Sequence, residues 1–316
     1  MTNLDKTLDD INKRWGDGSI MLMSDKPRKG IDAISTGCFS LDLATGVGGI
    51  PRGRSCEIFG KESSGKTTLM QHIVAEAQRA GLTAAYIDME HALDINYAER
   101  CGVDIGKLLL SQPDAGEQAL EIAEALARSG AVHLVVVDSI AKLVTRAEVE
   151  GDMGDSPMGG IARLMSQGLR KLAPVIAKNN VALVFTNQVR NKIGVIYGSP
   201  ETQPGGLAIK FDASVRIQLT RVNAETDETH AHIAAKVIKN KVAPPFKKCE
   251  FDILYATGID KIADLFSVCV TQNIIEHKGG GNYVYGDYKW RGKENMLQSL
   301  REDAVLAAEL TERIRG

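Results

Sequence analysis

"SCEIFGKESSGKTTLMQHIVAEAQRAG", residues 55–81, is the stretch that decides the fold of this chain. It consists of a short apolar strand, a glycine-containing loop and a helical run. Residues 60–67 match the pattern G-x-x-x-x-G-K-[ST], and the match lies between a strand and a helix, as the pattern requires. Such a loop turns its backbone N–H groups toward phosphates at the positive end of the helix. We therefore predict a phosphate-binding loop; the alternative is a glycine-rich turn without a ligand.

Composition sets the class of protein. A chain of 316 residues with 44% hydrophobic residues can bury a large core, and we expect one main domain with small appendages. No apolar run reaches the roughly 18 residues of a membrane span, and the polar N-terminus is not expected to be a secretory signal. The net charge of −2 means that any DNA site must be a local basic patch. An odd number of scattered cysteines favours a cytoplasmic protein: Cys38, Cys56, Cys101, Cys249 and Cys269.

The chain divides into three predicted parts. Residues 30–258 alternate near-continuous apolar strands with helices, which indicates an α/β fold whose mostly parallel sheet is covered on both faces. Residues 259–316 contain a helix, a glycine- and tyrosine-rich hairpin and a charged helical end, so we expect a small α+β domain. Residues 1–29 contain a helix with one apolar stripe, formed by Leu4, Leu8, Ile11 and Trp15. This stripe is covered either by the chain's own core or by another subunit.

Three positions predict that a magnesium nucleotide binds at the loop. The Lys66 side chain can reach β- and γ-phosphates, and the Thr67 hydroxyl can ligate Mg²⁺. Asp138 ends the apolar run "LVVVDS", where a carboxylate at the tip of a buried strand can hold the Mg²⁺ shell. Without the loop, an aspartate that caps the next turn would be the simpler interpretation.

Hydrolysis needs a group that acts on water. Glu90, in "YIDMEHALD", ends a neighbouring strand and can orient and deprotonate the attacking water. Asp88 competes for this role by position alone. Gln188 ends a third strand, "VFTNQ", and either contacts the γ-phosphate or is only a polar strand end.

Two glycine-rich segments follow these strands. Residues 189–206, "VRNKIGVIYGSPETQPGG", form a segment without helical periodicity, and long loops in compact domains are usually functional or disordered. Its Arg190, Lys192 and Tyr197 can contact phosphates and bases. The earlier segment, "EGDMGDSPMGG", precedes a helix that carries Arg163 and Arg170. A polymer that binds near either segment could respond to the state of the nucleotide.

Together, these motifs resemble the RecA family of bacterial recombinases. The resemblance rests on "GKESSGKTT", "IDMEHALD", "VVVDS", "GDSPMGG", "NQVRNKIGV" with "GSPET", and "KVIKNKVAPPFK", in this order and spacing, and it covers essentially the whole chain. It implies a DNA-dependent ATPase that forms helical filaments on single-stranded DNA, binds ATP between subunits, and carries out pairing and strand exchange in recombination and repair. Double-stranded DNA is a further implied partner, and a co-protease role toward a self-cleaving repressor in the SOS response is left open.

The resemblance also implies roles for individual residues. Glu90 would be the catalytic carboxylate, Asp138 the Mg²⁺ residue and Gln188 the γ-phosphate switch. Lys239 and Lys241 would reach a neighbouring subunit's γ-phosphate, although a solvated turn is the simpler interpretation of their spacing. Asp94 and Tyr97 would flank the adenine, and Tyr255 would pack on it. The phosphates would lie on Gly60, Lys61, Glu62, Ser63, Ser64, Gly65, Lys66, Thr67 and Thr68. The DNA path would be lined by Met158, Arg163, Arg170, Arg190, Lys192, Ile193, Gly194, Tyr197, Gly205 and Gly206.

The sequence departs from the family pattern at four positions and at its end. Lys61 replaces a proline that stiffens the loop, and Met89 adds bulk beside Glu90. Pro157 and Pro204 restrict the backbone of the two segments where switching is expected. The chain ends at "ELTERIRG" without the family's acidic tail, so the resemblance does not extend to the restraint on DNA access that such a tail implies.

Two other classes share parts of this pattern. A ring helicase of the same core fold also has the loop, the glutamate and the glutamine, but it normally supplies an arginine finger where this chain has a lysine pair. A metabolic kinase with the same loop needs a small-substrate pocket and a lid, whereas two DNA-type loops are predicted here. Filament formation and dependence of the ATPase on DNA distinguish these classes.

Overall fold

The computed structural model describes residues 2–25, 30–152, 159–191, 201–222 and 228–315. The chain consists of two compact units, Met1–Ile31 and Asp32–Gly316. The first unit contains helix α1 (Asn3–Trp15) and the 3-10 turn η1 (Met23–Asp25). Thr2 and Asp5 form a capping box at the start of α1, and Gly16 ends the helix. The predicted N-terminal helix is therefore present.

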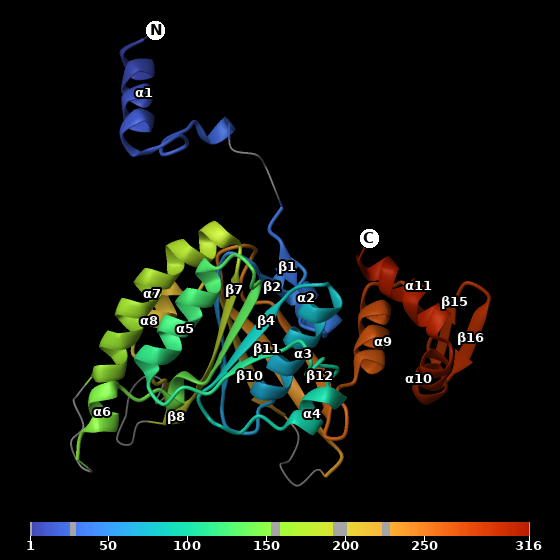
Figure 1. Cartoon of the computed structure of the whole chain (residues 1–316). Helices are drawn as coiled ribbons and strands as arrows, with labels where there is room; N and C mark the ends of the chain where they lie inside the picture. Colours follow the sequence, from blue (N-terminus) through green and yellow to red (C-terminus); the bar gives the residue numbers. More distant parts are fainter. Residues whose placement is uncertain (1, 26–29, 153–158, 192–200, 223–227, 316) are drawn as a thin grey trace. The chain divides into compact units, whose positions relative to one another are not determined.

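A mostly parallel sheet forms the centre of the second unit (Figure 1). Its order over the described residues is β13-β12-β11-β10-β3-β7-β6-β4-β5. Neighbours from β10 to β5 pair in parallel, whereas β10 to β13 pair antiparallel. The predicted α/β fold class is confirmed. The strands are β3 (Ser55–Gly60), β4 (Ala84–Asp88), β5 (Leu109–Ser111), β6 (Leu134–Asp138), β7 (Ala182–Gln188), β10 (Val215–Arg221), β11 (His230–Asn240), β12 (Lys248–Leu254) and β13 (Gly258–Ile259).

Helices cover both faces of the sheet, as the apolar strands predicted. Side chains of β6 alternate between the faces: Leu134 and Val136 pack in one core with α3 (Lys66–Arg79), and Val135 and Val137 pack in a second core. This second core includes residues of α5 (Gly116–Arg128) and α7 (Gly160–Asn179). Because β6 is buried along its whole length, its sequence is apolar up to the final Asp138.

Several short elements connect these layers. The strands β1 (Ala33–Ile34) and β2 (Ile50–Pro51) form an antiparallel pair, as do β8 (Arg190–Asn191) and β9 (Glu201–Thr202). The short helices are α2 (Phe39–Thr45), α4 (Ile95–Arg100), η2 (Ile140–Lys142), α6 (Arg146–Glu150) and α8 (Ala208–Asp212).

The C-terminal residues form the predicted helix, hairpin and helical end. Their hydrophobic cluster contains residues of α9, α10 and α11 together with Tyr285 of the hairpin. The division at residue 259 stays a prediction. Over the described residues, none of the helices combines the length and the apolar composition that crossing a membrane requires. The elements are α9 (Lys261–Thr271), β14 (Glu276–His277), β15 (Asn282–Tyr285), β16 (Tyr288–Arg291), α10 (Lys293–Glu302) and α11 (Ala304–Arg315).

One buried histidine joins the loop-bearing helix to the last strand of the sheet. His72, on α3, is 2% exposed, and its Nε2 accepts a hydrogen bond from the backbone N–H of Ile259 at 2.9 Å. Burial, with the nearby Lys261 ammonium, lowers the pKa of His72 from 6.5 to about 3. The folded protein therefore holds this ring neutral.

We expect His72 to make folding sensitive to acid. Below about pH 6.5 His72 takes up a proton in the unfolded chain but stays neutral in the folded chain. The contribution of His72 to the free energy of unfolding is therefore complete above that pH and is lost as the pH falls toward 3. Chemical denaturation between pH 7 and 4 should show a shallower fall in the free energy of unfolding for His72→Gln, by up to about 1.4 kcal/mol per pH unit. His277→Gln, at an exposed histidine, is the control. Equal slopes for wild type and His72→Gln would contradict this assignment.

Candidate functional site

The parallel pairing brings four predicted residues to one edge of the sheet. Gly60 of β3 pairs with Gln188 of β7, and Asp88 of β4 pairs with Asp138 of β6. These strands are adjacent, in the order β3-β7-β6-β4. Ligands of open α/β sheets bind outside the carboxyl ends of the strands. The predicted nucleotide residues are therefore assembled at the edge where a ligand is expected.

The loop after β3 leaves the start of α3 open. Gly65 precedes the helix with φ = +82°, and no side chain caps the first N–H groups. A Cβ at Gly65 would lie 2.4 Å from Cδ1 of Ile253, so this position requires glycine. Uncapped N–H groups at the positive end of a 14-residue helix fit a phosphate group.

Lys66 folds back over the loop. Its Nζ donates to the carbonyl oxygens of Gly60 at 3.3 Å and Lys61 at 2.7 Å. Partial burial lowers the pKa of the Lys66 ammonium, while the carboxylates of Asp138, Glu90 and Glu62 oppose that shift. The Ser64 hydroxyl also donates to the carbonyl of Lys61, at 2.8 Å, whereas the side chains of Lys61, Glu62 and Ser63 are exposed.

Asp138 is buried among hydroxyl donors. Its Oδ2 accepts from Thr67 Oγ1 at 3.0 Å and from Tyr86 Oη at 2.6 Å, and its Oδ1 accepts from the hydroxyl of Thr186. Burial raises the pKa of Asp138, and the hydrogen bonds from Thr186, Tyr86 and Thr67 oppose this effect. The oxygen pair of Thr67 and Asp138 fits the preference of Mg²⁺ for one or two protein oxygens beside phosphate and water.

Glu90 lies between the ends of β6 and β7. Its Oε1 accepts from the Ser139 hydroxyl at 2.7 Å and lies 3.5 Å from Nε2 of Gln188. The Glu90 side chain is half-buried. A carboxylate held by a hydroxyl and beside an amide has a defined direction and can act on water.

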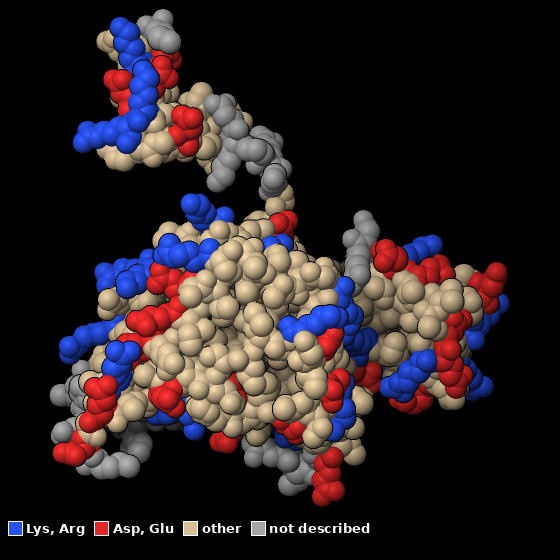
Figure 2. Space-filling model, in the orientation of Figure 1, with Lys and Arg blue, Asp and Glu red and all other residues tan. Residues whose placement is uncertain are grey.

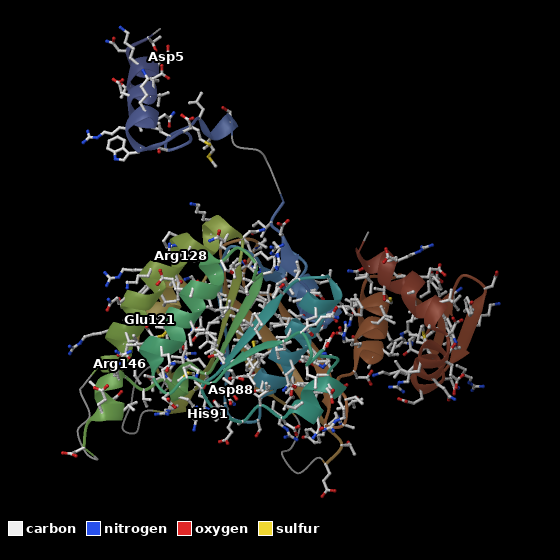
Figure 3. The ribbon with its side chains drawn as sticks, in the orientation of Figure 1. Asp5, Asp88, His91, Glu121, Arg128 and Arg146 are labelled. Carbon is white, nitrogen blue, oxygen red and sulfur yellow. The ribbon has the colours of Figure 1, made fainter. Side chains whose placement is uncertain are left out.

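Asp88, the competing carboxylate, instead accepts hydrogen bonds from the backbone and from one side-chain amide. It is 2% exposed and accepts from the N–H of Glu90 at 3.0 Å, the N–H of Leu93 at 3.2 Å and Nε2 of Gln112 at 3.0 Å. Figure 3 labels Asp88 beside His91 at the end of β4. The geometry favours Glu90 as the group that faces water. Met89 is 6% exposed in the core with α5 and α7, so its bulk fills the core rather than the site.

Of the three residues predicted at the adenine, Tyr97 contacts the loop helix. Tyr97 Oη is 3.2 Å from Oγ1 of Thr68 on α3, and Asp94 caps α4 by accepting from the N–H of Tyr97 at 3.0 Å. Tyr255, just after β12, is 40% exposed, and the Arg221 guanidinium lies 5.9 Å from its ring centroid. Contact of these residues with adenine stays a prediction.

The predicted DNA residues are placed in part. Arg163 and Arg170 are exposed on α7, and Arg190 is exposed on β8. Gly205 has φ = +83°, and a Cβ there would lie 2.8 Å from Cγ2 of Ile140, so glycine brings the end of the second segment against η2. Gly206 packs beside Ala162 of α7. The predicted Met158, Lys192, Ile193, Gly194 and Tyr197, as well as Pro157, lie outside the described residues.

Lys239 and Lys241 bind the end of a helix. Lys239 Nζ donates to the carbonyl oxygens of Lys210 at 2.7 Å and Phe211 at 2.8 Å, and Lys241 Nζ donates to Phe211 at 3.3 Å. Desolvation and the neighbouring Lys241 lower the pKa of Lys239. These carbonyls belong to α8, which follows the second segment, so the lysines stabilise that helix end within the subunit.

Sequence reasoning missed the polar residues that orient the carboxylates. Tyr86 and Thr186 hold Asp138, Ser139 holds Glu90, and Gln112 holds Asp88. Their signal was weak, because Tyr86 is a single hydroxyl within an apolar strand and Thr186 is one of three polar residues at a strand end. Glu57, a charged residue inside the run "SCEIFG", was a stronger signal, since a buried carboxylate requires a partner.

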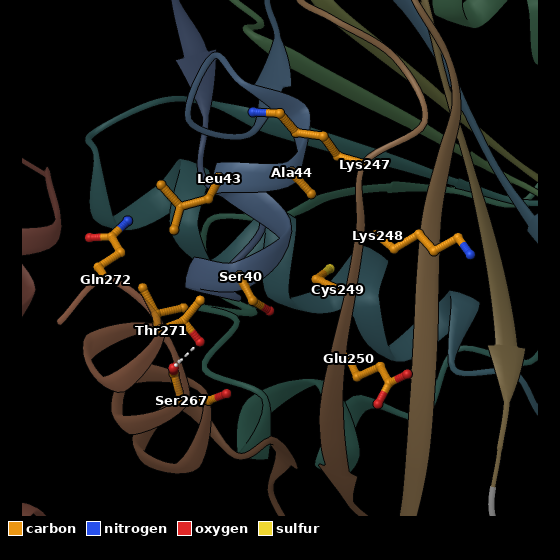
Figure 4. Close-up of a pocket in the computed structure, with 11 residues that line it drawn as sticks. Ser40, Leu43, Ala44, Lys247, Lys248, Cys249, Glu250, Ser267, Thr271 and Gln272 are labelled. Carbon is orange, nitrogen blue, oxygen red and sulfur yellow. Dashed lines mark hydrogen bonds between the residues drawn. The ribbon is translucent and has the colours of Figure 1, made fainter. Parts of the chain in front are cut away.

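One face of the described residues carries mixed charge, and one cavity lies outside the candidate site. On the face drawn in Figure 2, basic and acidic side chains are interspersed around a broad uncharged area. A cavity of about 590 Å³ lies where α2, β12 and α9 meet (Figure 4). Its lining includes Ser40, Cys249 and Thr271 but none of the predicted nucleotide residues.

Comparisons with known proteins agree with this geometry. The RecA N-terminal domain family matches residues 2–260. A Protein RecA from Herpetosiphon aurantiacus is 54% identical over 312 residues, which cover 98% of this chain and 87% of the relative. A Protein RecA from Clostridium perfringens is 50% identical, covering 100% of this chain and 93% of the relative, and one from Gluconacetobacter polyoxogenes is 52% identical, covering 99% and 90%. On this evidence, the chain belongs to the RecA family.

Proposed function

We propose that this protein is a DNA-dependent ATPase that forms ATP-bound helical filaments on single-stranded DNA and carries out homologous pairing and strand exchange in recombination and repair. Membership of the RecA family supports this function. The observation that carries it is the position of Gln188. Its amide lies 3.5 Å from Glu90, while its backbone leads through Val189 into β8, the start of the second predicted DNA segment. A single residue thus connects the candidate chemistry to the candidate DNA path.

The loop and Asp138 would hold ATP with Mg²⁺. The uncapped N–H groups of α3 and the Lys66 ammonium would bind the phosphates, because charged phosphate oxygens are stronger acceptors than the carbonyls that Lys66 now contacts. Thr67 and Asp138 would hold Mg²⁺, which neutralises charge on the phosphates. The buried hydroxyls of Tyr86 and Thr186 keep the Asp138 carboxylate oriented toward Thr67.

Glu90 would position the attacking water and accept its proton. The Ser139 hydroxyl fixes one carboxylate oxygen, and Gln188 lies at the same oxygen. A shift of Gln188 therefore changes the surroundings of Glu90 directly. This contact supplies a physical route by which DNA at the second segment alters the rate of hydrolysis.

Lys239 and Lys241 would act across the subunit interface. In the single subunit they bind the end of α8, and an incoming γ-phosphate of a neighbour would offer a charged acceptor instead. Helix α1, in which no residue is buried, would dock its apolar stripe on an adjacent subunit. Duplex DNA would be the second DNA partner, a self-cleaving repressor a further one, and the cytoplasm the compartment.

The first test separates the two carboxylates. Glu90→Gln should retain ATP binding and lose about 100-fold or more of the hydrolysis rate, because general-base catalysis contributes that much. Asp88→Asn should mainly destabilise the fold, by about 1–3 kcal/mol, because its buried oxygens satisfy backbone and amide donors. Steady-state ATPase rates and thermal unfolding measure both effects. Normal turnover by Glu90→Gln would make Asp88 the next candidate.

The second test concerns DNA dependence. Hydrolysis of ATP should be slow without DNA and strongly stimulated by single-stranded DNA, because Gln188 links the second segment to Glu90. The measurement is the ATPase rate with and without saturating single-stranded DNA, and electron microscopy of the same samples should show filaments. Equal rates with and without DNA would instead favour a DNA-independent P-loop enzyme.

The third test asks whether two subunits share one site. Lys66→Ala and Lys239→Ala should each abolish DNA-stimulated hydrolysis, and Lys239→Ala should retain nucleotide affinity in the isolated subunit. If the two lysines serve opposite sides of a shared site, mixed filaments contain some intact sites and regain part of the activity. If the two variants co-assemble but their mixtures regain no activity, Lys239 either acts on the nucleotide of its own subunit or has no role in hydrolysis.

A further inference from the structure

A charged residue lies inside the strand that leads to the phosphate loop. Glu57 stands in the middle of β3 and is 0% exposed. A buried carboxylate is costly unless hydrogen bonds and an opposite charge satisfy it. Glu57 Oε2 accepts from Nε of Arg216 on β10 at 2.5 Å, and its Oε1 accepts from Nδ2 of Asn187 on β7 at 2.9 Å. Glu57 therefore ties β3 to both of its neighbours in the sheet.

Both partners of Glu57 also hold the end of the second segment. Asn187 Nδ2 donates to the carbonyl oxygen of Pro204 at 3.1 Å, and a terminal nitrogen of Arg216 donates to Oε1 of Gln203 at 2.8 Å. Asn187 is 0% exposed and Arg216 is 8% exposed. Pro204 contributes only its carbonyl, so the N–H that proline lacks is not required here.

The same network reaches the glutamine at the end of β7. Asn187 Oδ1 accepts from the backbone N–H of Gln188 at 2.9 Å. The Arg216 guanidinium also lies 4.8 Å from the centroid of the Phe59 ring, one residue before the phosphate loop. Residues 203 and 204 are thus connected to Gln188 and to the loop strand through two buried side chains.

We propose that Glu57, Asn187, Gln203 and Arg216, with the carbonyl of Pro204, form a clasp that transmits the position of the second segment's end to Gln188. Glu57 and Arg216 are positioning residues in this proposal, since neither contacts the predicted nucleotide groups. The inference rests on the proposed function and adds to it the device that couples DNA to hydrolysis. Hydrogen bonds in a buried network strengthen one another. A displacement of residues 203–204 therefore weakens the hydrogen bonds of Asn187, and this in turn affects Gln188.

Arg216→Lys tests the clasp with little disturbance of the core. Lysine keeps a positive charge beside Glu57, but it lacks the planar guanidinium group whose two nitrogens bind Glu57 and Gln203 at the same time. We expect the DNA-free ATPase rate and the KM for ATP to stay within about twofold of wild type. The kcat at saturating single-stranded DNA should fall about tenfold, the effect of losing one hydrogen bond to a charged group.

Arg52→Lys is the matched control. Arg52 is half-buried where Arg216 is buried. Like Arg216 it donates through Nε, to the carbonyl of Asn180 at 3.0 Å, but it lies at the amino ends of β3 and β7. Its replacement should leave the stimulation by DNA unchanged. Equal loss of stimulation in Arg52→Lys and Arg216→Lys would show a general structural effect and overturn the proposal.

Gln203 provides a second route if Arg216→Lys does not fold. Gln203→Glu keeps an acceptor for Arg216 and should keep the ratio of DNA-stimulated to DNA-free rates, whereas Gln203→Leu should lower that ratio about tenfold. If both residues act in one clasp, Arg216→Lys with Gln203→Leu is no worse than either change alone. Multiplicative losses in the double variant would contradict the clasp.

The outcomes for wild type separate this inference from the proposed function. Wild-type protein without DNA stimulation would overturn the proposed function and, with it, the clasp. Wild-type stimulation that Arg216→Lys and Gln203→Leu fully retain would overturn the clasp alone. A fall in kcat at unchanged KM, confined to the DNA-stimulated reaction, supports it.

Discussion

The parallel pairing of β3, β7, β6 and β4 is the constraint on which the candidate site depends. This pairing places Gly60, Gln188, Asp138 and Asp88 at the carboxyl ends of adjacent strands, although they are far apart in the sequence. Helices on both faces bury the strands, so the polar groups at their ends lie at the edge where ligands of open α/β sheets bind. The chemistry of Lys66, Glu90 and Asp138 follows from that arrangement.

Much of this arrangement could be predicted from the sequence. The phosphate loop, the apolar strands and the long helices each have a strong local pattern, and the structure has them where the pattern places them. The grouping of strand ends then follows from the geometry of a parallel sheet. Short elements such as α4 and α8 were not predicted, because they lack a full period of apolar residues and depend on tertiary contacts.

The residue pattern alone favoured Glu90 over Asp88 only modestly. Both carboxylates stand at the end of the same strand. Only the structure shows that Asp88 accepts hydrogen bonds from the N–H groups of Glu90 and Leu93, which gives it the role of holding the turn after the strand. Likewise, the spacing of Lys239 gave no partner, because the carbonyls it binds lie on α8, 28 residues away in the sequence. Side-chain hydrogen bonds of this kind depend on distances between elements that sequence periodicity does not encode.

The central claim is that nucleotide and DNA act on one connected edge of the sheet. Backbone hydrogen exchange, measured with a non-hydrolysable ATP analogue, with single-stranded DNA and with both, tests it most directly. Our account predicts that the nucleotide alone slows exchange in residues 60–68 and also at residues 187–188 and 201–206. Protection confined to residues 60–68, with the other two segments unchanged until DNA is added, would contradict it.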